Sequence, residues 1–292
     1  MNTFTIKDLE NLSGIKAHTI RIWEQRYSFL KPERTETNIR YYSNQELKTI
    51  LSIALLNKYG FKISHINKMN ETELQNKITA LSNAEACRER IVNDLINCMI
   101  DLDNEGFESL LDNYIFTKGI DKTILQIIFP FLDRIGILWL TNHIHPVQEH
   151  LVCNIIRQKL IVGIEGVTAN TVINKKIMLF LPEGEHHEIG LLYIYYLLKK
   201  RGAKIFYLGA NVPVKDIGFA CKYKQPDYIY THLTCMTSSF SFQKFIAQKN
   251  LYIKDFPLVI SGRIAQTQAK KSISDIHFKR SLPEVLEYVA SL

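Results

Sequence analysis

Short apolar runs alternate with helical patterns from about Asn174 to the C-terminus, and this alternation constrains the fold more than any other feature of the 292 residues. Repeated strand and helix patterns of this kind predict a parallel, doubly wound sheet. We therefore expect an α/β domain of Rossmann-like, flavodoxin-like type. The predicted strands are residues 175–181, 204–208, 227–231, 257–260 and 275–279, and the predicted helices lie near 188–201, 213–223, 238–249 and 282–291.

The first predicted strand is followed by a loop with the sequence PEGEHHE, residues 182–188. The loop places imidazoles flanked by carboxylates at the carboxyl end of a parallel strand, which is where open α/β sheets bind ligands. A neutral imidazole is the commonest protein ligand for a metal, and a nearby carboxylate can hold its other ring nitrogen. The loop therefore predicts a ligand or metal site.

Several kinds of domain share this strand and helix pattern. A response receiver would need a clustered acidic pocket and an aspartate that ends its central strand, and neither is present. A dinucleotide fold would need GxGxxG after its first strand, which is also absent. The segment after the strand instead reads Glu185-x-His187-x-x-Gly190.

The sequence before the predicted sheet indicates two helical parts. Up to about Asn70, short helical patterns are broken at Gly14 and Pro32, and a longer helix starts near Ser43, where Glu46 completes a capping box. From 71 to 170, apolar residues recur at helical spacing, which predicts a four-helix bundle. The predicted domains are residues 1–72, 73–170 and 171–292.

The net charge of +7 is concentrated at the N-terminus. Residues 1–70 contain 11 Lys and Arg against 6 Asp and Glu, which is +5 of the total. Lysine and arginine that neutralise phosphates release counterions, so this asymmetry favours a polyanion as the partner of the first part.

The first 70 residues also contain a helix, a glycine turn and a second helix that carries Arg21, Trp23 and Arg26. A second helix in this arrangement can enter the major groove of DNA. A basic and aromatic segment with Arg40 and Tyr41 follows. The residues that carry a family resemblance are 19–27, Leu30, Pro32, Arg34 and 40–43, and they resemble the winged helix-turn-helix of the MerR family over nearly all of residues 3–70.

The MerR resemblance implies an all-α winged helix-turn-helix head that binds double-stranded DNA. Arg21 and Trp23 would lie on the groove side with Arg26 nearby, and Arg40 and Tyr41 would be wing contacts with phosphate and sugar. The alternative for Trp23 is a place in the small core of the head. MerR-type regulators act as dimers on pseudo-palindromic sites, which implies a homo-oligomer.

A second resemblance concerns the sheet. Thr231-x-Leu233 ends the third predicted strand, and Ser261-Gly262 ends the fourth. Together with the Glu185 motif, these residues resemble the cobalamin-binding domain, whose pattern is DxHxxG, then SxL, then GG.

The cobalamin resemblance implies a role for each motif residue. His187 would replace the cofactor's own benzimidazole as the lower axial ligand of cobalt, with Glu185 orienting it. Gly190 would let the start of the helix approach the displaced nucleotide tail, which lies in a channel lined by small residues. The chain has Glu for Asp and Thr for Ser, which keep the chemistry, whereas Ser261 in place of the first glycine can narrow that channel.

The bundle carries a further match. Trp139 is followed, after nine residues, by Glu149-His150. This spacing resembles the bundle that caps cobalamin in CarH-type light-responsive repressors, and it implies that Trp139 covers the upper ligand while Glu149 and His150 meet the adenosyl group. Trp139 could instead be a core residue of the bundle. Leu140 stands where some members have a histidine that takes cobalt after photolysis, which weakens the case for a bis-histidine light product.

Other sequence features concern the cellular compartment and an alternative metal site. The five cysteines are scattered and never form CxxC, which favours a reducing cytoplasm. The sequence shows neither a signal-peptide pattern nor an apolar run of the roughly 18 residues that span a bilayer. A zinc site made of His143, His145, His150 and His187 is an alternative, although nothing in their spacing defines a tetrahedral set.

The resemblances together imply a transcriptional repressor, not an enzyme. It would sense adenosylcobalamin, and light, through release of the upper ligand and a change of oligomeric state. Two alternatives remain open. The chain could be a MerR-type regulator whose cobalamin-like domain has turned to another ligand or to a partner, or it could be a module of a cobalamin enzyme.

Overall fold

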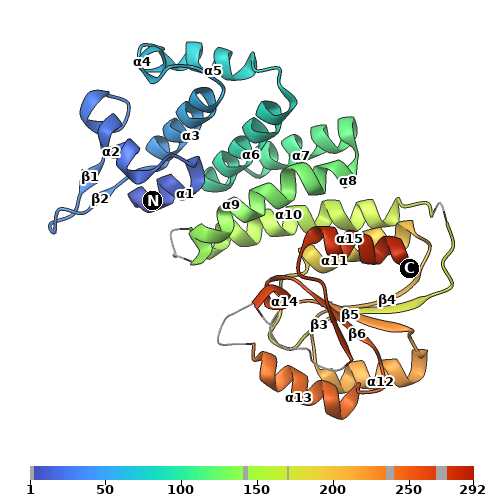
Figure 1. Cartoon of the computed structure of the whole chain (residues 1–292). Coiled ribbons are helices and arrows are strands. Elements are labelled where there is room, and N and C mark those ends of the chain that lie inside the picture. The colour runs from blue at the N-terminus through green and yellow to red at the C-terminus, as the bar shows by residue number, and fades with distance from the viewer. Residues whose placement is uncertain (1–2, 141–143, 170, 235–239, 268–274) are drawn as a thin grey trace. The chain divides into compact units, whose positions relative to one another are not determined.

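The computed structural model describes residues 3–140, 144–169, 171–234, 240–267 and 275–292, without the side chains of Ile137, Trp139 and Leu140. By its internal packing the chain divides into two compact units, Met1–Ile155 and Ile156–Leu292. The boundary falls inside helix α10 (Pro146–Glu165). Each unit has its own architecture (Figure 1).

The N-terminal unit begins with a small helical head. Three of its helices start with capping boxes, in which a side chain accepts from a backbone N–H three residues on, at Thr5, Ser43 and Asn70. The box predicted at Ser43 and Glu46 is therefore confirmed. The elements are α1 (Ile6–Ser13), α2 (Ala17–Arg26), β1 (Glu33–Arg34), β2 (Arg40–Tyr41), α3 (Asn44–Lys58), α4 (Ile63–Ile66) and α5 (Glu71–Thr79).

Two features hold this head together. Gly14 ends α1 in the left-handed conformation at φ 74°, which turns the chain into α2. Phe4 and Tyr42 exchange backbone hydrogen bonds of 2.9 and 2.8 Å, which joins the N-terminus to the end of the β1–β2 hairpin. Both side chains are fully buried, and the other buried apolar residues of the head include Leu9, Leu12, Ile20, Leu47, Ile50 and Leu51.

The bundle follows, with α6 (Ala84–Asp101), α7 (Asn104–Lys118), α8 (Ile120–Thr123), a π-helical turn η1 (Ile124–Ile128), α9 (Phe129–Leu140) and α10. Residues 120–140 form one long helix with the π turn just ahead of Pro130. Proline lacks the N–H that an α-helix interior needs and its ring crowds the preceding turn, so the wider turn accommodates it. Pro146 is the first residue of α10, where a missing N–H is harmless.

The head packs on the bundle within this unit. Helix α1 contacts α9, and α3 contacts α6. The Asn93 side chain on α6 donates to the Leu51 carbonyl on α3 at 3.4 Å and accepts from Arg134 on α9 at 2.5 Å. The predicted boundaries near residues 72 and 170 therefore do not coincide with the division into two units, and the three-domain description stays a prediction.

The C-terminal unit contains the predicted parallel sheet. Its described strands are β3 (Lys176–Pro182), β4 (Lys204–Val212), β5 (Tyr228–His232), β6 (Leu258–Ser261) and β7 (Ile276–Phe278), in the order β4-β3-β5-β6-β7, with every described pair parallel. The predicted fold class is thus confirmed. The helices are α11 (Ile189–Lys200), α12 (Val214–Lys224), α13 (Phe242–Tyr252), α14 (Arg263–Thr267), which was not predicted, and α15 (Leu282–Ser291).

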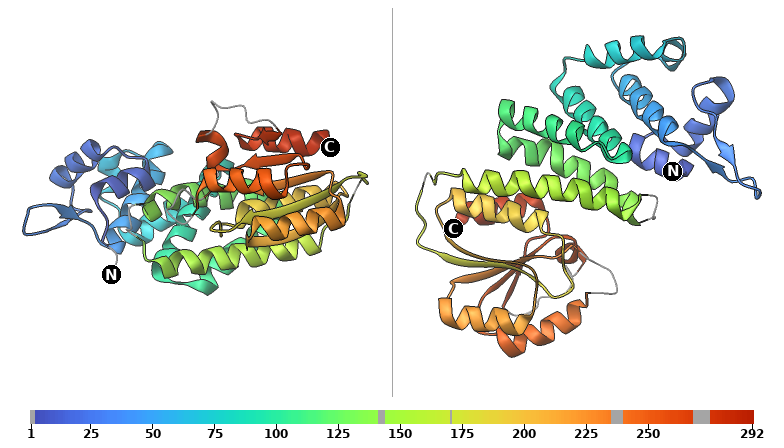
Figure 2. Two further views of the ribbon diagram at one scale, coloured as in Figure 1. Left: turned by 90° about the horizontal axis from the view of Figure 1, so that it is seen from below. Right: turned by 180° about the vertical axis from the view of Figure 1, so that it is seen from behind.

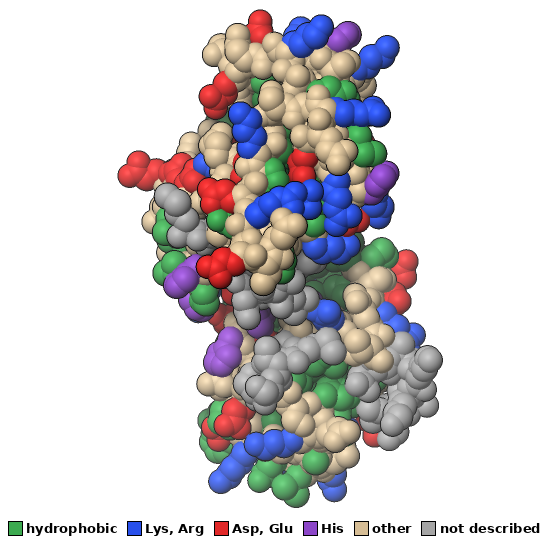
Figure 3. All heavy atoms as spheres, turned by 90° about the vertical axis from the view of Figure 1, so that its left-hand side faces the viewer, with side chains coloured by type: hydrophobic (Ala, Val, Ile, Leu, Met, Phe, Trp, Pro, Cys, Tyr) green, Lys and Arg blue, Asp and Glu red, His purple; other side chains and the backbone are tan. Residues whose placement is uncertain are grey.

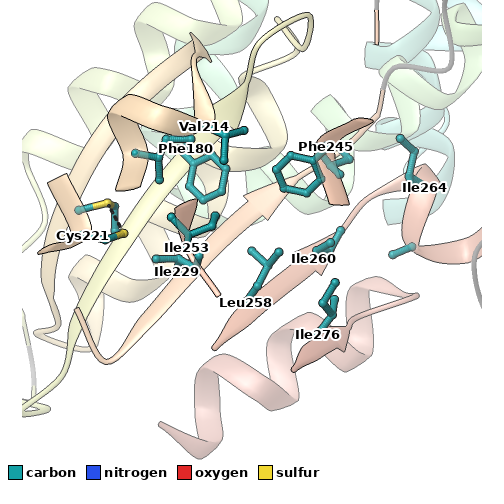
Figure 4. Packing of buried hydrophobic residues seen from close by; sticks show 14 of the residues in the cluster. Phe180, Val214, Cys221, Ile229, Phe245, Ile253, Leu258, Ile260, Ile264 and Ile276 are labelled. Carbon is teal, nitrogen blue, oxygen red and sulfur yellow. Dashed lines mark hydrogen bonds between the residues drawn. The ribbon is translucent and has the colours of Figure 1, made fainter. Parts of the chain in front are cut away.

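Helices cover both faces of this sheet (Figure 2). Alternate residues of β3 point to opposite faces, so Leu179 packs with α11 and α15, whereas Phe180 packs with α12 and α13 (Figure 4). Burial on both faces explains why the strand is apolar throughout rather than alternating. None of the described helices has the length and apolar character that crossing a bilayer requires.

The turn after β6 generates the first testable prediction. Gly262 has φ 91°, and a Cβ there would lie 2.5 Å from the Leu233 carbonyl oxygen. Because both the backbone conformation and the packing exclude a side chain, Gly262→Ala should lower the free energy of unfolding by at least ~2 kcal/mol in urea titrations. Gly136→Ala is the control, since a Cβ there meets nothing within 4 Å. It should be neutral or stabilise α9 by up to about 1 kcal/mol, and equal destabilisation by both variants would contradict the assignment.

Candidate cofactor crevice and nucleic-acid interface

The strand order places a topological switch point at the carboxyl edge of the sheet, and sheets of this kind have their ligand crevice at that point. The chain leaves β3 toward β4 on one side, and later returns to β5 on the other side of β3. In sheets of this order, ligands bind where the direction reverses, between the loops that follow the two central strands. Residues 183–188 follow β3, and Leu233 and Thr234 follow β5, so the predicted loop lies beside this point of the sheet.

The Glu185 carboxylate joins the two loops. It is fully buried, and one oxygen accepts from the backbone N–H groups of His186 and His187 at 3.0 and 3.1 Å. The other oxygen accepts from the Thr234 N–H, beyond β5, at 2.8 Å. A buried carboxylate is costly unless it is well hydrogen-bonded, so these bonds hold both loops in one arrangement.

The same carboxylate orients the His187 ring. Glu185 Oε1 lies 2.7 Å from Nδ1 of His187, whose side chain is 46% exposed. When Nδ1 carries the proton and donates to the carboxylate, the lone pair of the neutral ring is on Nε2. That is the donor that a transition metal with a nitrogen ligand requires, so the residues present fit the lower face of cobalamin.

Residues on β4 and α10 support the loop and were missed by the sequence analysis. The Asn211 side chain accepts from the Gly184 N–H at 2.9 Å. Glu188 accepts from the Tyr207 hydroxyl at 2.8 Å and pairs with Arg157 at 3.0 Å. No sequence motif marks Asn211, Tyr207 or Arg157, because they meet the loop only through the tertiary fold.

The other motif residues of the sheet lie side by side on β5 and β6. The Leu233 N–H donates to the Ser261 carbonyl at 2.9 Å, and Gly262 packs against the Leu233 backbone. Thr231 is fully buried, and within the described residues its hydroxyl has no hydrogen-bond partner. Such a group is unusual in a folded protein and is available to a polar ligand.

His232 is the residue of this region that sequence reasoning missed. Its Nδ1 lies 2.8 Å from the Ser261 hydroxyl. Burial lowers the pKa of His232 to about 4, so the ring is neutral at pH 7. A Cβ added at Gly190 would lie 2.8 Å from Cε1 of this ring and closer still to Cδ2 and Nε2. The only sequence signal for His232 was its size, because it is a large residue at the middle position of Thr231-x-Leu233.

The predicted upper-ligand residues belong to the N-terminal unit. Trp139 lies in α9, but its side chain and that of Leu140 are outside the described part. Glu149 is partly buried and His150 is exposed, both near the start of α10. Their contact with an upper ligand stays a prediction. For the zinc alternative, the described residues contain no group of three or more His, Cys, Asp or Glu that could hold a metal, and His143 lies outside them.

In the head, α2 presents two of the predicted DNA contacts. Arg21 and Arg26 are exposed. Trp23, expected on the groove side, is instead buried at 7% exposure and packs edge-on against Phe29 with ring centroids 6.0 Å apart. This burial favours the alternative of a core position, and a contact between Trp23 and DNA stays a prediction.

The wing presents a different pattern from the one expected. Arg40 is 28% exposed and its Nε pairs with Glu24 of α2 at 2.9 Å, while the Tyr42 hydroxyl also donates to Glu24. Tyr41 donates to Glu33. Arg40 thus joins the wing to α2, and its contact with phosphate stays a prediction. Figure 3 looks at the side from which the β1–β2 hairpin projects and shows Lys and Arg gathered on the N-terminal unit.

The contact between Gly190 and His232 predicts an energetic coupling. Gly190→Ala should destabilise the protein by roughly 1–3 kcal/mol, because the methyl group overlaps the imidazole, although alanine is the better helix former. His232→Ala should remove most of that penalty. Urea unfolding of the parent, both single variants and the double variant measures the coupling, and a coupling energy near zero would contradict this packing.

The pair between Arg40 and Glu24 predicts that two arginines of the head behave differently. Arg40→Ala should lower the free energy of unfolding by ~1.5 kcal/mol, because it leaves a mostly buried carboxylate without its cation. Arg21→Ala should change stability by no more than about 0.5 kcal/mol, but should reduce the slope of log affinity for DNA against log salt by about 1. Thermal unfolding and DNA titrations at several salt concentrations test both, and a stable Arg40→Ala head would contradict the structural role.

Comparison with known proteins gives family matches for the head and for the helical bundle. A family model for the MerR HTH family regulatory protein matches residues 4–73, and one for the B12 binding domain matches residues 91–162. The HTH-type transcriptional repressors CarA and CarH of Myxococcus xanthus are 26% and 25% identical to this chain. They match 93% and 91% of it, and 91% and 90% of their own lengths.

A solved structure shares the fold. The monomethylamine corrinoid protein of Methanosarcina barkeri superposes with a TM-score of 0.57 at 15% identity, over 70% of this chain and 100% of that one. The two long sequence relatives are repressors, which agrees with the prediction of a regulator rather than an enzyme. The chain therefore combines a MerR-type helix-turn-helix with a B12-binding domain, and it is homologous to the CarA and CarH repressors over most of its length.

Proposed function

We propose that this protein is a transcriptional repressor that binds adenosylcobalamin, with His187 as the lower ligand of cobalt, and that the bound cofactor controls its grip on operator DNA. The observation that carries the proposal is the buried Glu185 carboxylate, which holds Nδ1 of His187 at 2.7 Å at the ligand crevice of the sheet. The MerR-type head on the same chain supplies the DNA-binding part.

The residues of the crevice each have a task in this proposal. His187 offers Nε2 to the metal, and Glu185 keeps the proton on Nδ1 and raises the basicity of the ring. Asn211 holds the loop through Gly184, and the Thr231 hydroxyl is available to a polar group of the ligand. Bound adenosylcobalamin would supply a cobalt–carbon bond that light can break.

In this proposal Trp139, Glu149 and His150 contact the upper, adenosyl ligand of the cofactor. The resemblance to the bundle of CarH-type repressors supports these contacts. Release of the adenosyl group would change what these side chains touch. We propose that the loaded protein forms a tetramer and that illumination shifts it toward smaller forms. Because binding energies are reciprocal, cofactor binding would then strengthen DNA binding by the same factor by which DNA strengthens cofactor binding.

On the DNA side, Arg21 and Arg26 of α2 would contact the major groove and its phosphates. A dimer of the chain would place two such helices on two half-sites of a pseudo-palindromic operator. The Arg40 and Glu24 pair keeps the wing and α2 in one orientation, so the two contact the same stretch of duplex.

The proposal is tested by cofactor binding in the dark. Purified protein is incubated with adenosylcobalamin and passed through a gel-filtration column with absorbance and mass detection. We expect the corrinoid absorbance to comigrate with the protein and the mass to increase, and illumination to reverse the increase. Protein that elutes without the absorbance would contradict the proposal and favour a regulator with another ligand.

Variants of the loop identify the ligand. Glu185→Gln should weaken cofactor binding by roughly 10–100-fold, the usual effect of losing the partner of a metal-bound histidine. His187→Ala should weaken it at least as much. His186→Ala is the matched control, because that ring is exposed and its backbone N–H, which donates to Glu185, is unchanged. Equal affinities of the His186 and His187 variants would remove His187 from the site.

A further inference from the structure

One side chain in the crevice has no role in the proposed cofactor site. The His232 ring ends β5 and lies against Gly190 at the start of α11, with the Ser261 hydroxyl 2.8 Å from its Nδ1. Along β5, Tyr230 packs on the α11 side of the sheet, so His232 two residues later faces the same helix.

The ring fills the space that the glycine leaves. A Cβ at Gly190 would lie less than 3.0 Å from three atoms of the imidazole, so the ring is in contact with the Gly190 backbone and nothing else fits between them. The close approach to the helix start that a glycine permits is therefore already taken by a side chain of this protein.

We propose that His232 is a gate for the nucleotide tail of cobalamin. The ring must leave Gly190 before the tail can lie along the start of α11, so displacing the ring lowers the affinity for a corrinoid with a tail and leaves the affinity for one without a tail unchanged. This inference rests on the proposed function, and it names the part of the cofactor whose binding His232 opposes.

The contacts of the His232 ring allow it to turn away from Gly190. Within the described part of the chain, a hydrogen bond to Ser261 holds the ring, and the ring is neutral, so no charge is separated when it turns away. His232 is the last residue of its strand and is partly exposed, so we expect its ring to reach another side-chain rotamer. Two residues on, the Thr234 N–H bonds to Glu185, so the gate is close to the carboxylate that orients His187.

The experiment compares adenosylcobalamin with adenosylcobinamide, which keeps the upper ligand and lacks the nucleotide tail. Affinities are measured in the dark by absorbance titration of the full-length parent and three variants. His232→Ala should bind adenosylcobalamin about tenfold more tightly than the parent does, which corresponds to one buried hydrogen bond plus displaced packing. Its affinity for adenosylcobinamide should stay within about twofold of the parent value.

Two further variants sharpen the comparison. Ser261→Ala keeps the ring but removes its bond, so it should give a smaller gain for adenosylcobalamin alone. His277→Ala is the matched control, because this imidazole is exposed on β7, away from the crevice, and it should change neither affinity. Circular dichroism checks that each variant is folded. If His232→Ala does not fold, the affinities of Ser261→Ala for the two corrinoids test the proposal instead.

The results of these titrations distinguish failure of the His232 gate from failure of the proposed cobalamin binding. A parent that binds neither corrinoid contradicts both proposals. A parent that binds both, with His232→Ala and Ser261→Ala unchanged, contradicts the gate and leaves the function standing. Equal gains for the two corrinoids would also overturn it, since a gate for the tail cannot affect a ligand that has none.

Discussion

The buried carboxylate of Glu185 is the interaction on which the crevice depends. It accepts from two backbone N–H groups of its own loop, from the His187 ring and from the Thr234 N–H beyond β5. Removing a carboxylate from water is unfavourable by several kcal/mol unless such donors replace the lost hydration. The loops after β3 and β5 therefore adopt the arrangement that supplies these donors. When the neutral His187 ring donates its Nδ1 proton to this carboxylate, the lone pair is on Nε2.

The second determinant of the crevice is the absence of a side chain at Gly190. The imidazole of His232 occupies that space and Ser261 bonds to it, so the glycine, the histidine and the serine act as one packing unit. Ser261 stands where the cobalamin-binding pattern has its first glycine. Its effect on the crevice exceeds its own volume, because its hydroxyl is hydrogen-bonded to the larger ring of His232. The two determinants are linked through the chain, since His232 and Thr234 are two residues apart.

The head uses a carboxylate in a similar way. Glu24 of α2 binds both Arg40 of the wing and the Tyr42 hydroxyl, and its side chain is only 9% exposed. This pair fixes the wing relative to the helix that is expected to enter the groove. Arg21 and Arg26 are exposed, and in the proposed function they make the contact with DNA.

Much of the architecture was predictable from the sequence alone. Apolar runs, capping residues and turn glycines act over a few residues, so the strands, most helices and the loop with Glu185 and His187 followed from local pattern. Helix α14, the burial of Trp23, the pairing of Arg40 and the position of His232 did not, because each depends on a partner distant in the chain. The sequence by itself determined most of the elements and the motifs that they carry. Only the tertiary structure decided which polar groups meet, because packing brings residues as far apart as Gly190, His232 and Ser261 into contact.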